Sequence, residues 1–167
     1  MITKCKNCSQ HSNIKLSDEY IIYEGIKLFR IIAIKYFKDI NKGDKGGYVQ
    51  SLDNISGDAW IAGNAKVFED GRIMDNALAK DNAIIRGNAT VSKRAIVLEN
   101  AVISGHAKIF GWAMIKGHAR VSNRGQVSQD AKIGGEVEIQ GLVFGKTQLV
   151  NDEFINSDII LPPIRAA

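Results

Sequence analysis

Three residues near the N-terminus, Cys5, Cys8 and His11, have the spacing of metal ligands. A structural zinc ion takes four thiolate or imidazole ligands, and the C-x2-C-x2-H arrangement supplies three of them. The sequence offers no obvious fourth ligand, and the same residues also suit a reduced, mobile tail at residues 1–14. Zinc at the N-terminus is therefore one of two interpretations, and no other cofactor is expected.

Two further histidines, His106 and His118, are candidates for a general base, because imidazole titrates close to neutral pH. Each follows a glycine at a place where related segments, such as Gly63-Asn64, have asparagine. The simpler interpretation is that each histidine only forms hydrogen bonds with the backbone at a corner of the chain. The choice depends on the elements that position these side chains.

Those elements show as small residues that recur every six positions, without exception, through the middle of the chain. Two positions after each one stands an aliphatic residue, β-branched everywhere except at Ala79. Six does not match the 3.6-residue period of a helix, whereas positions two apart lie on one side of a strand. Each hexad is therefore a short strand with two inward side chains. The small residues are Ala59, Ala65, Gly71, Ala77, Ala83, Ala89, Ala95, Ala101, Ala107, Ala113, Ala119, Gly125 and Ala131.

Pairs of turn-forming residues, such as Asp75-Asn76 and Gly105-His106, separate the hexads. Gly, Asn and Asp tolerate a left-handed backbone, so each hexad is expected to end in a tight corner. A side chain larger than that of alanine would not fit inside such a bend. The sequence thus predicts an all-β solenoid with a narrow polygonal cross-section.

The hexads IAGNAK, IRGNAT and IKGHAR resemble the hexapeptide repeat of left-handed parallel β-helix proteins. In that family three hexads form one triangular coil of about 18 residues. The resemblance implies a single-stranded left-handed parallel β-helix of about five coils over residues 57–143. The segment from Phe29 to Ala65 also resembles the N-terminal part of bacterial and phage hexapeptide-repeat proteins that are classed as acyltransferases.

The ends of the solenoid need caps, because an open end exposes unpaired strand edges. Alternating apolar residues on both sides of Glu24-Gly25 predict a β-hairpin, which we expect to cap the first coil within residues 15–56. The repeat weakens at Val137, Val143 and Leu149. Residues 144–167 are therefore expected to form an irregular C-terminal cap or an arm.

With three hexads in each coil, side chains 18 residues apart should stack in outward columns. One such column is strongly apolar, and stacked apolar side chains would form a patch of several hundred Å², larger than the patches scattered over most surfaces. The chain's own termini, a second subunit or a foreign protein could cover it, and the resemblance favours a homotrimer. The predicted interface consists of Trp60, Leu78, Ile96 and Met114, with Leu98 beside them and Ile84 and Val102 in the neighbouring column.

Two functions remain open. An uninterrupted repeat without a catalytic constellation favours a non-catalytic solenoid that binds a protein, and the resemblance suggests an accessory protein of a phage or mobile element, such as an inhibitor of a host defence complex. The alternative is an acyl-CoA-dependent O- or N-acyltransferase that uses His106 or His118 at a subunit interface. A carbonic-anhydrase-like zinc site is not expected, because it needs three histidines and these two fall on different corners.

Composition excludes several other classes. The chain has 22 Lys and Arg against 18 Asp and Glu, a net charge of +4, without any long block of like charge. Neither a nucleic-acid-binding stripe nor a membrane segment is evident. Cys5 and Cys8 are too close together for a disulfide framework, so we expect a soluble cytoplasmic protein.

Overall fold

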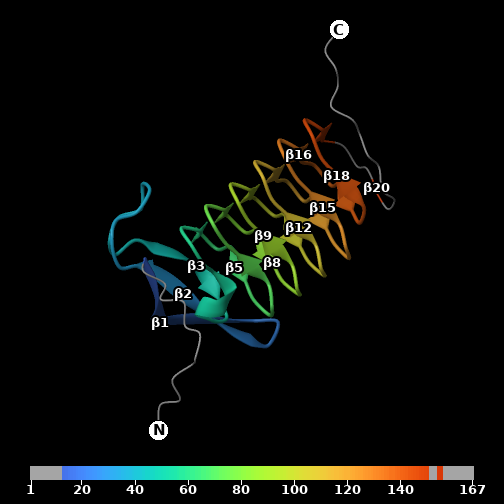
Figure 1. The fold of residues 1–167 in the computed structure, drawn as a ribbon. Helices are drawn as coiled ribbons and strands as arrows, with labels where there is room; N and C mark the ends of the chain where they lie inside the picture. Colours follow the sequence, from blue (N-terminus) through green and yellow to red (C-terminus); the bar gives the residue numbers. More distant parts are fainter. Residues whose placement is uncertain (1–12, 151–153, 156–167) are drawn as a thin grey trace.

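The computed structural model describes residues 13–150 and 154–155, and nearly all of its regular elements are strands. The exception is a single 3-10 turn, η1 (Leu52–Asn54). The chain winds as a parallel solenoid with three sheets along its length (Figure 1), which confirms the predicted all-β fold. No helix among the described residues is long and apolar enough to cross a membrane.

One side of the solenoid is a six-stranded parallel sheet. Trp60 pairs with Leu78, Leu78 with Ile96, and Ile96 with Met114, so most neighbouring strands are 18 residues apart. This register confirms the coil of three hexads. The strands, in spatial order, are β4 (Trp60–Ile61), β7 (Leu78–Ala79), β10 (Ile96–Val97), β13 (Met114–Ile115), β16 (Lys132–Ile133) and β19 (Gln148–Leu149).

The other two sides are a five-stranded and a nine-stranded sheet. Both use the same spacing through the middle of the chain. The five-stranded sheet contains β6 (Arg72–Ile73), β9 (Thr90–Val91), β12 (Lys108–Ile109), β15 (Gln126–Val127) and β18 (Leu142–Val143). The nine-stranded sheet contains β1 (Ile14–Tyr23), β2 (Ile26–Ala33), β3 (Lys45–Val49), β5 (Lys66–Val67), β8 (Ile84–Ile85), β11 (Val102–Ile103), β14 (Arg120–Val121), β17 (Glu138–Ile139) and β20 (Phe154–Ile155).

The last described coil is shorter than the others. Lys132 pairs with Gln148 and Glu138 with Phe154, which gives a spacing of 16 residues. Two residues are missing from the corner between β17 and β18, so Val143 and Leu149 take the inward aliphatic positions of regular strands. The six-residue pattern weakens there because the strand positions shift by two residues in the sequence. The described strands continue past residue 143. The rest of the predicted C-terminal cap, 151–153 and 156–167, lies outside the described residues.

The interior is filled by the two predicted inward columns. Ala95 and Val97 have no exposed surface, and the same holds for their equivalents through most of the coils. A carbonyl group of the next coil lies directly beside the small position. At Gly125 even a Cβ atom would come within 2.7 Å of the Ile139 carbonyl oxygen, so the coil is tighter there than alanine allows.

The corners contain an unpredicted set of hydrogen bonds between coils. The first residue of each corner is left-handed, and Lys93 and Glu99 occupy this conformation with φ values of 62° and 60°. The carboxylate of Asp81 accepts a hydrogen bond from the backbone N–H of Glu99, and the carboxylate of Glu99 accepts one from the N–H of Gly117. Acidic corner residues therefore satisfy the corner N–H group one coil further on.

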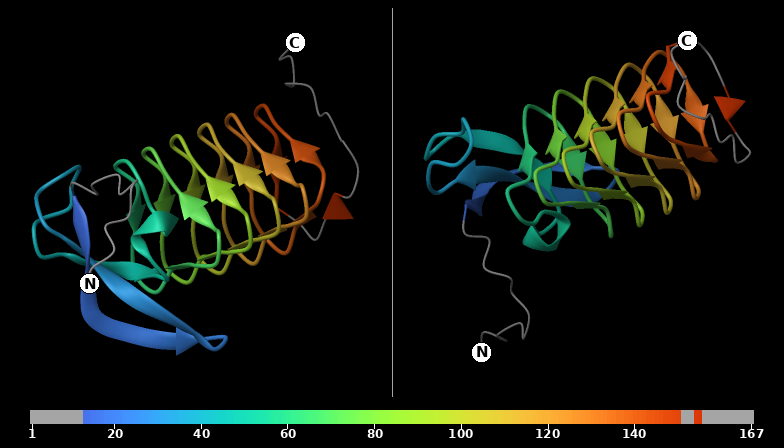
Figure 2. Two further views of the ribbon diagram at one scale, coloured as in Figure 1. Left: turned by 60° about the horizontal axis from the view of Figure 1, so that its bottom comes forward. Right: turned by 45° about the horizontal axis from the view of Figure 1, so that its top comes forward.

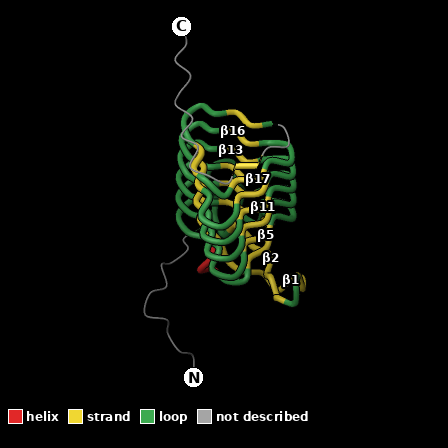
Figure 3. The backbone as a smooth tube through the Cα atoms, turned by 90° about the vertical axis from the view of Figure 1, so that its right-hand side faces the viewer, coloured by secondary structure: helices red, strands yellow, loops and turns green. Residues whose placement is uncertain are grey.

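The N-terminal segment continues the nine-stranded sheet. The predicted hairpin is present as antiparallel β1 and β2, and β2 pairs with β3, which pairs in parallel with β5 (Figures 2 and 3). β3 crosses very close to the first coil, because a Cβ atom at Gly47 would lie 2.5 Å from the Ala65 carbonyl oxygen. The cap is thus joined to the first coil through the same parallel pairing that joins the coils to one another.

Enlarging a buried small residue should destabilise the solenoid. We expect Ala95→Leu to lower the free energy of unfolding by about 1–3 kcal/mol, because the added carbons have no space between neighbouring coils. Thr90→Leu, which places the same leucine side chain on the outward side of β9, should change it by less than about 0.5 kcal/mol. Urea unfolding followed by circular dichroism measures both; equal stability of the two variants would contradict the packing described here.

Variants of Asp81 should separate two contributions of a corner residue to stability: the hydrogen bond that its side chain accepts and its tolerance of a left-handed backbone. Asp81→Asn keeps both the acceptor and the tolerance of positive φ, so its stability should stay close to that of the parent. Asp81→Gly loses only the acceptor and should cost about 0.5–1.5 kcal/mol. Asp81→Ala also strains the left-handed backbone and should cost about 1 kcal/mol more. If Asp81→Gly were as stable as Asp81→Asn in thermal or urea unfolding, the coil-to-coil hydrogen bond would contribute nothing.

Candidate functional site

The predicted apolar column exists, and it lies on the six-stranded sheet. Leu78, Ile96 and Met114 stack in successive strands with partly exposed side chains. Residues two positions before and after them also point outward, which makes a grid of three coils by three positions. We call this grid the central face; it consists of Asn76, Leu78, Lys80, Arg94, Ile96, Leu98, Trp112, Met114 and Lys116.

Trp60, which was predicted to extend this column, is not available to a partner. Its ring meets the edge of Phe37 at a centroid distance of 5.8 Å, and the two side chains are 7% and 9% exposed. Phe37 belongs to the loop between β2 and β3, so the protein's own cap covers the first position. A flat apolar ring beside the open end of a sheet is protected from water in this way.

Ile84 and Val102, the neighbouring column of the prediction, lie on the nine-stranded sheet and face a different direction. Ile84 packs against a cluster in which Leu28 of the hairpin and Phe68, which follows β5, are fully buried. Glu24 at the hairpin tip holds Arg86 in an ion pair of 2.7 Å. The predicted interface is therefore divided between two sheets, and the hairpin occupies part of the second.

The hairpin also changes the surroundings of Lys66. The ammonium group of Lys66 lies over the ring of Tyr23, 4.9 Å from its centroid, and burial lowers the pKa of Lys66. Beyond the hairpin tip, a cleft of about 320 Å³ runs along the nine-stranded sheet past Val102 and Arg120. The Glu24–Arg86 ion pair, the side chains of Arg120 and Glu138 and two serine hydroxyl groups line this cleft together with apolar side chains.

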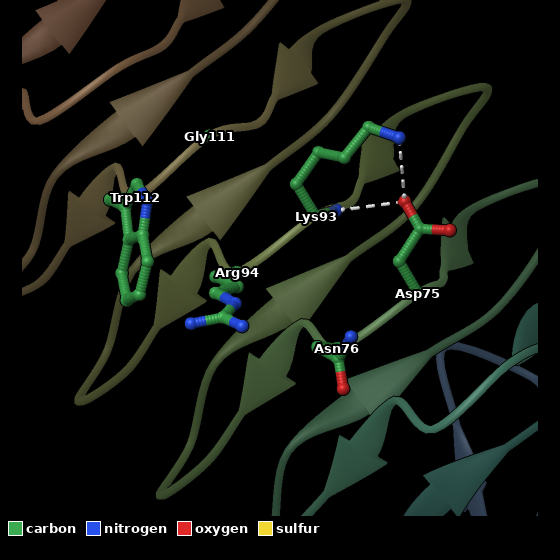
Figure 4. A pocket seen from close by; sticks show the side chains of 6 residues that line it. All are labelled: Asp75, Asn76, Lys93, Arg94, Gly111 and Trp112. Carbon is green, nitrogen blue, oxygen red and sulfur yellow. Dashed lines mark hydrogen bonds and ion pairs between the residues drawn. The ribbon is translucent and has the colours of Figure 1, made fainter.

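The corners between two sheets stack along the solenoid in a row that we call a ridge. A pocket of about 510 Å³ lies on the ridge between the five-stranded and six-stranded sheets (Figure 4). Asp75 accepts a hydrogen bond of 3.0 Å from the backbone N–H of Lys93 and forms an ion pair of 3.5 Å with its ammonium group. In Figure 4 the side chains of Asn76, Arg94 and Trp112 point away from this pair, and each of these residues stands two positions before a strand residue of the six-stranded sheet. The ridge therefore supplies one column of the central face.

Arg94 and Trp112 are the most distinctive residues of this ridge. The guanidinium carbon of Arg94 lies 4.5 Å from the centre of the Trp112 ring, which is 60% exposed. Nearby, Lys38 donates a hydrogen bond to the Asn76 carbonyl oxygen, and its pKa is lowered by burial and by Arg94 against the opposing effect of Asp58. We did not predict this pair from the sequence; the signal was Lys-Arg and Gly-Trp at corners where Asp-Asn is usual.

The structure places His106 and His118 on different ridges. His118 follows Asn82 and Asn100 in the column between the six-stranded and nine-stranded sheets, whereas His106 lies between the nine-stranded and five-stranded sheets. Both are exposed, and their backbone N–H groups bond to the Gly135 and Asn123 carbonyl oxygens of the next coil. A single chain therefore does not bring the two imidazoles together.

The predicted zinc ligands Cys5, Cys8 and His11 lie outside the described residues. Within residues 13–150 and 154–155, no group of three or more His, Cys, Asp or Glu side chains is placed to hold a metal ion. The zinc interpretation thus stays a prediction.

Comparison with known proteins leaves the function to be argued from the geometry. No protein-family model matches the sequence, and no curated protein matches it.

Proposed function

We propose that this protein is a non-catalytic β-solenoid that binds a protein partner through the central face. The observation that carries the proposal is the unbroken stack of Leu78, Ile96 and Met114, three large apolar side chains held in register on a flat sheet. Burial of such side chains against a partner is favourable by about 25 cal/mol for each Å² removed from water.

The surroundings of the stack have the composition of a binding centre. Trp112 and Arg94 stand at one side of it, and tryptophan and arginine are enriched among the residues that dominate binding energy. Leu98 lies at the other side, next to Ile96 in the same coil. Because the core fixes the backbone under every one of these positions, little conformational entropy is lost when a partner binds.

The proposal includes two expectations that rest on the resemblance alone. One is a homotrimer, in which further copies of the chain form part of the assembly. The other is an accessory role in a phage or mobile element. The acyltransferase alternative requires His106 or His118 to meet a second subunit, and no contact of either side chain within the described residues favours it.

Replacing Ile96 should test the face directly. A carboxylate at the centre of an apolar contact is costly to bury, so Ile96→Asp should weaken partner binding at least about tenfold. The matched control is Thr90→Asp, an equally outward position on the five-stranded sheet, which should leave binding unchanged. Solution mass by light scattering and quantitative capture of native partners provide the readouts, with circular dichroism to verify folding.

If Ile96→Asp and Thr90→Asp both kept the parent's mass and the same captured proteins, the central face would not be the binding surface. Coenzyme A binding that was lost in His106→Ala or His118→Ala would instead favour the acyltransferase.

A further inference from the structure

The charges on the central face are all of one sign. Lys80, Arg94 and Lys116 carry three positive charges, and none of the nine positions is Asp or Glu. Outside the central face, Lys132 adds a fourth cation in β16, but the residues two positions before the outward residues of β4 and β16 are Asp58 and Asp130. An apolar column whose charged neighbours are all cations is thus a property of the three coils of the central face.

These cations are not neutralised by the described part of the chain. None of the four ion pairs among the described residues includes Lys80, Arg94 or Lys116. Arg94 lies over a neutral ring, and a guanidinium stacked in this way can still donate its N–H groups to a carboxylate at the ring edge.

Four carboxylates on the two bordering ridges already have partners within the chain. Asp58 accepts a hydrogen bond from Asn13, Asp75 pairs with Lys93, and Asp81 and Glu99 accept backbone N–H groups. Asp130 and Glu136 lie one coil beyond Trp112 and His118 on these two ridges, outside the central face. A molecule that covered the central face would therefore have to supply the negative charge that pairs with Lys80, Arg94 and Lys116.

We propose that the occupant of the central face is an acidic protein segment with alternating or neighbouring apolar side chains. Its apolar groups would cover Leu78, Ile96 and Met114, and its carboxylates would pair with Arg94 on one side and with Lys80 and Lys116 on the other. The inference rests on the proposed function, because it assigns the chemistry of the partner at the same surface.

Charge and shape favour this occupant over two others. A second copy that docked through the same face would place three cations against three cations, which is unfavourable. A nucleic acid binds through cations that follow its phosphates, whereas here the middle of the face is an uncharged aliphatic column. An acidic and apolar protein segment matches both the column and its borders.

The test is a reversal of specificity. A displayed library of random peptides of about twelve residues is selected on the parent protein and on the triple variant Lys80→Glu, Arg94→Glu, Lys116→Glu. Peptides selected on the parent should be enriched at least about twofold in Asp and Glu, and peptides selected on the triple variant should be enriched in Lys and Arg. A control variant with Arg72→Glu and Lys108→Glu on the five-stranded sheet should keep the acidic preference.

The outcomes separate this inference from the proposed function. Selected peptides that depend on Ile96 but show no acidic enrichment, or an enrichment that survives the triple reversal, would overturn the inference and leave the binding face intact. Binding of a single-stranded or duplex oligonucleotide that the triple variant loses would assign the face to nucleic acid instead. A parent oligomer that the triple variant dissociates would assign it to a second copy. If Ile96→Asp changed no selection at all, the proposed function itself would be wrong.

Discussion

The close approach of neighbouring coils is the constraint on which the rest of the structure depends. Parallel strands stack about 4.8 Å apart, so each corner has room for one methyl group and little more. Alanine fills this space at Ala95 and its equivalents, and the β-branched residue two positions later fills the centre of the same coil. Because this space is similar from coil to coil, the small residues keep a six-residue period from Ala59 to Ala131.

A fixed period decides what happens on the outside. Each outward residue is held directly above its equivalent in the preceding coil, as Ile96 is above Leu78. Side chains that are far apart in the sequence therefore become one surface whose spacing is set by backbone hydrogen bonds rather than by their own contacts. A solenoid of this kind can present a flat pattern of apolar and charged groups at almost no cost in conformational entropy.

The corners and the cap show how the period is protected. Acidic residues such as Asp81 and Glu99 connect one corner to the next through hydrogen bonds to backbone N–H groups. The hairpin continues the nine-stranded sheet, and the loop that follows it places Phe37 over Trp60. The first position of the apolar column is therefore covered by the chain itself. As a result, the exposed part of the apolar column begins at Leu78.

The inward-facing positions could be predicted from the sequence because only small and β-branched side chains fit the space inside the coils. Ala79 and Gly125 kept the pattern although their side chains differ from the usual ones. The outward half was less accessible. Neither the cover of Phe37 over Trp60 nor the cover of the hairpin over Ile84 follows from a repeat, because both depend on the path of a segment outside it. The Arg94–Trp112 contact needed side-chain directions at a corner, and the two-residue deletion before Leu142 needed the strand register.

The stacking of outward columns is measured most directly by pairs of engineered cysteines in a Cys5→Ser, Cys8→Ser background. Lys80→Cys with Leu98→Cys places two thiols one coil apart in a single column, where the spacing of about 4.8 Å falls within the range that a disulfide can bridge. Lys80→Cys with Ser92→Cys places them on different sheets. Under mild oxidation we predict an intramolecular disulfide in the first pair only. Equal yields in both pairs, or a disulfide in the second pair alone, would contradict the shared face.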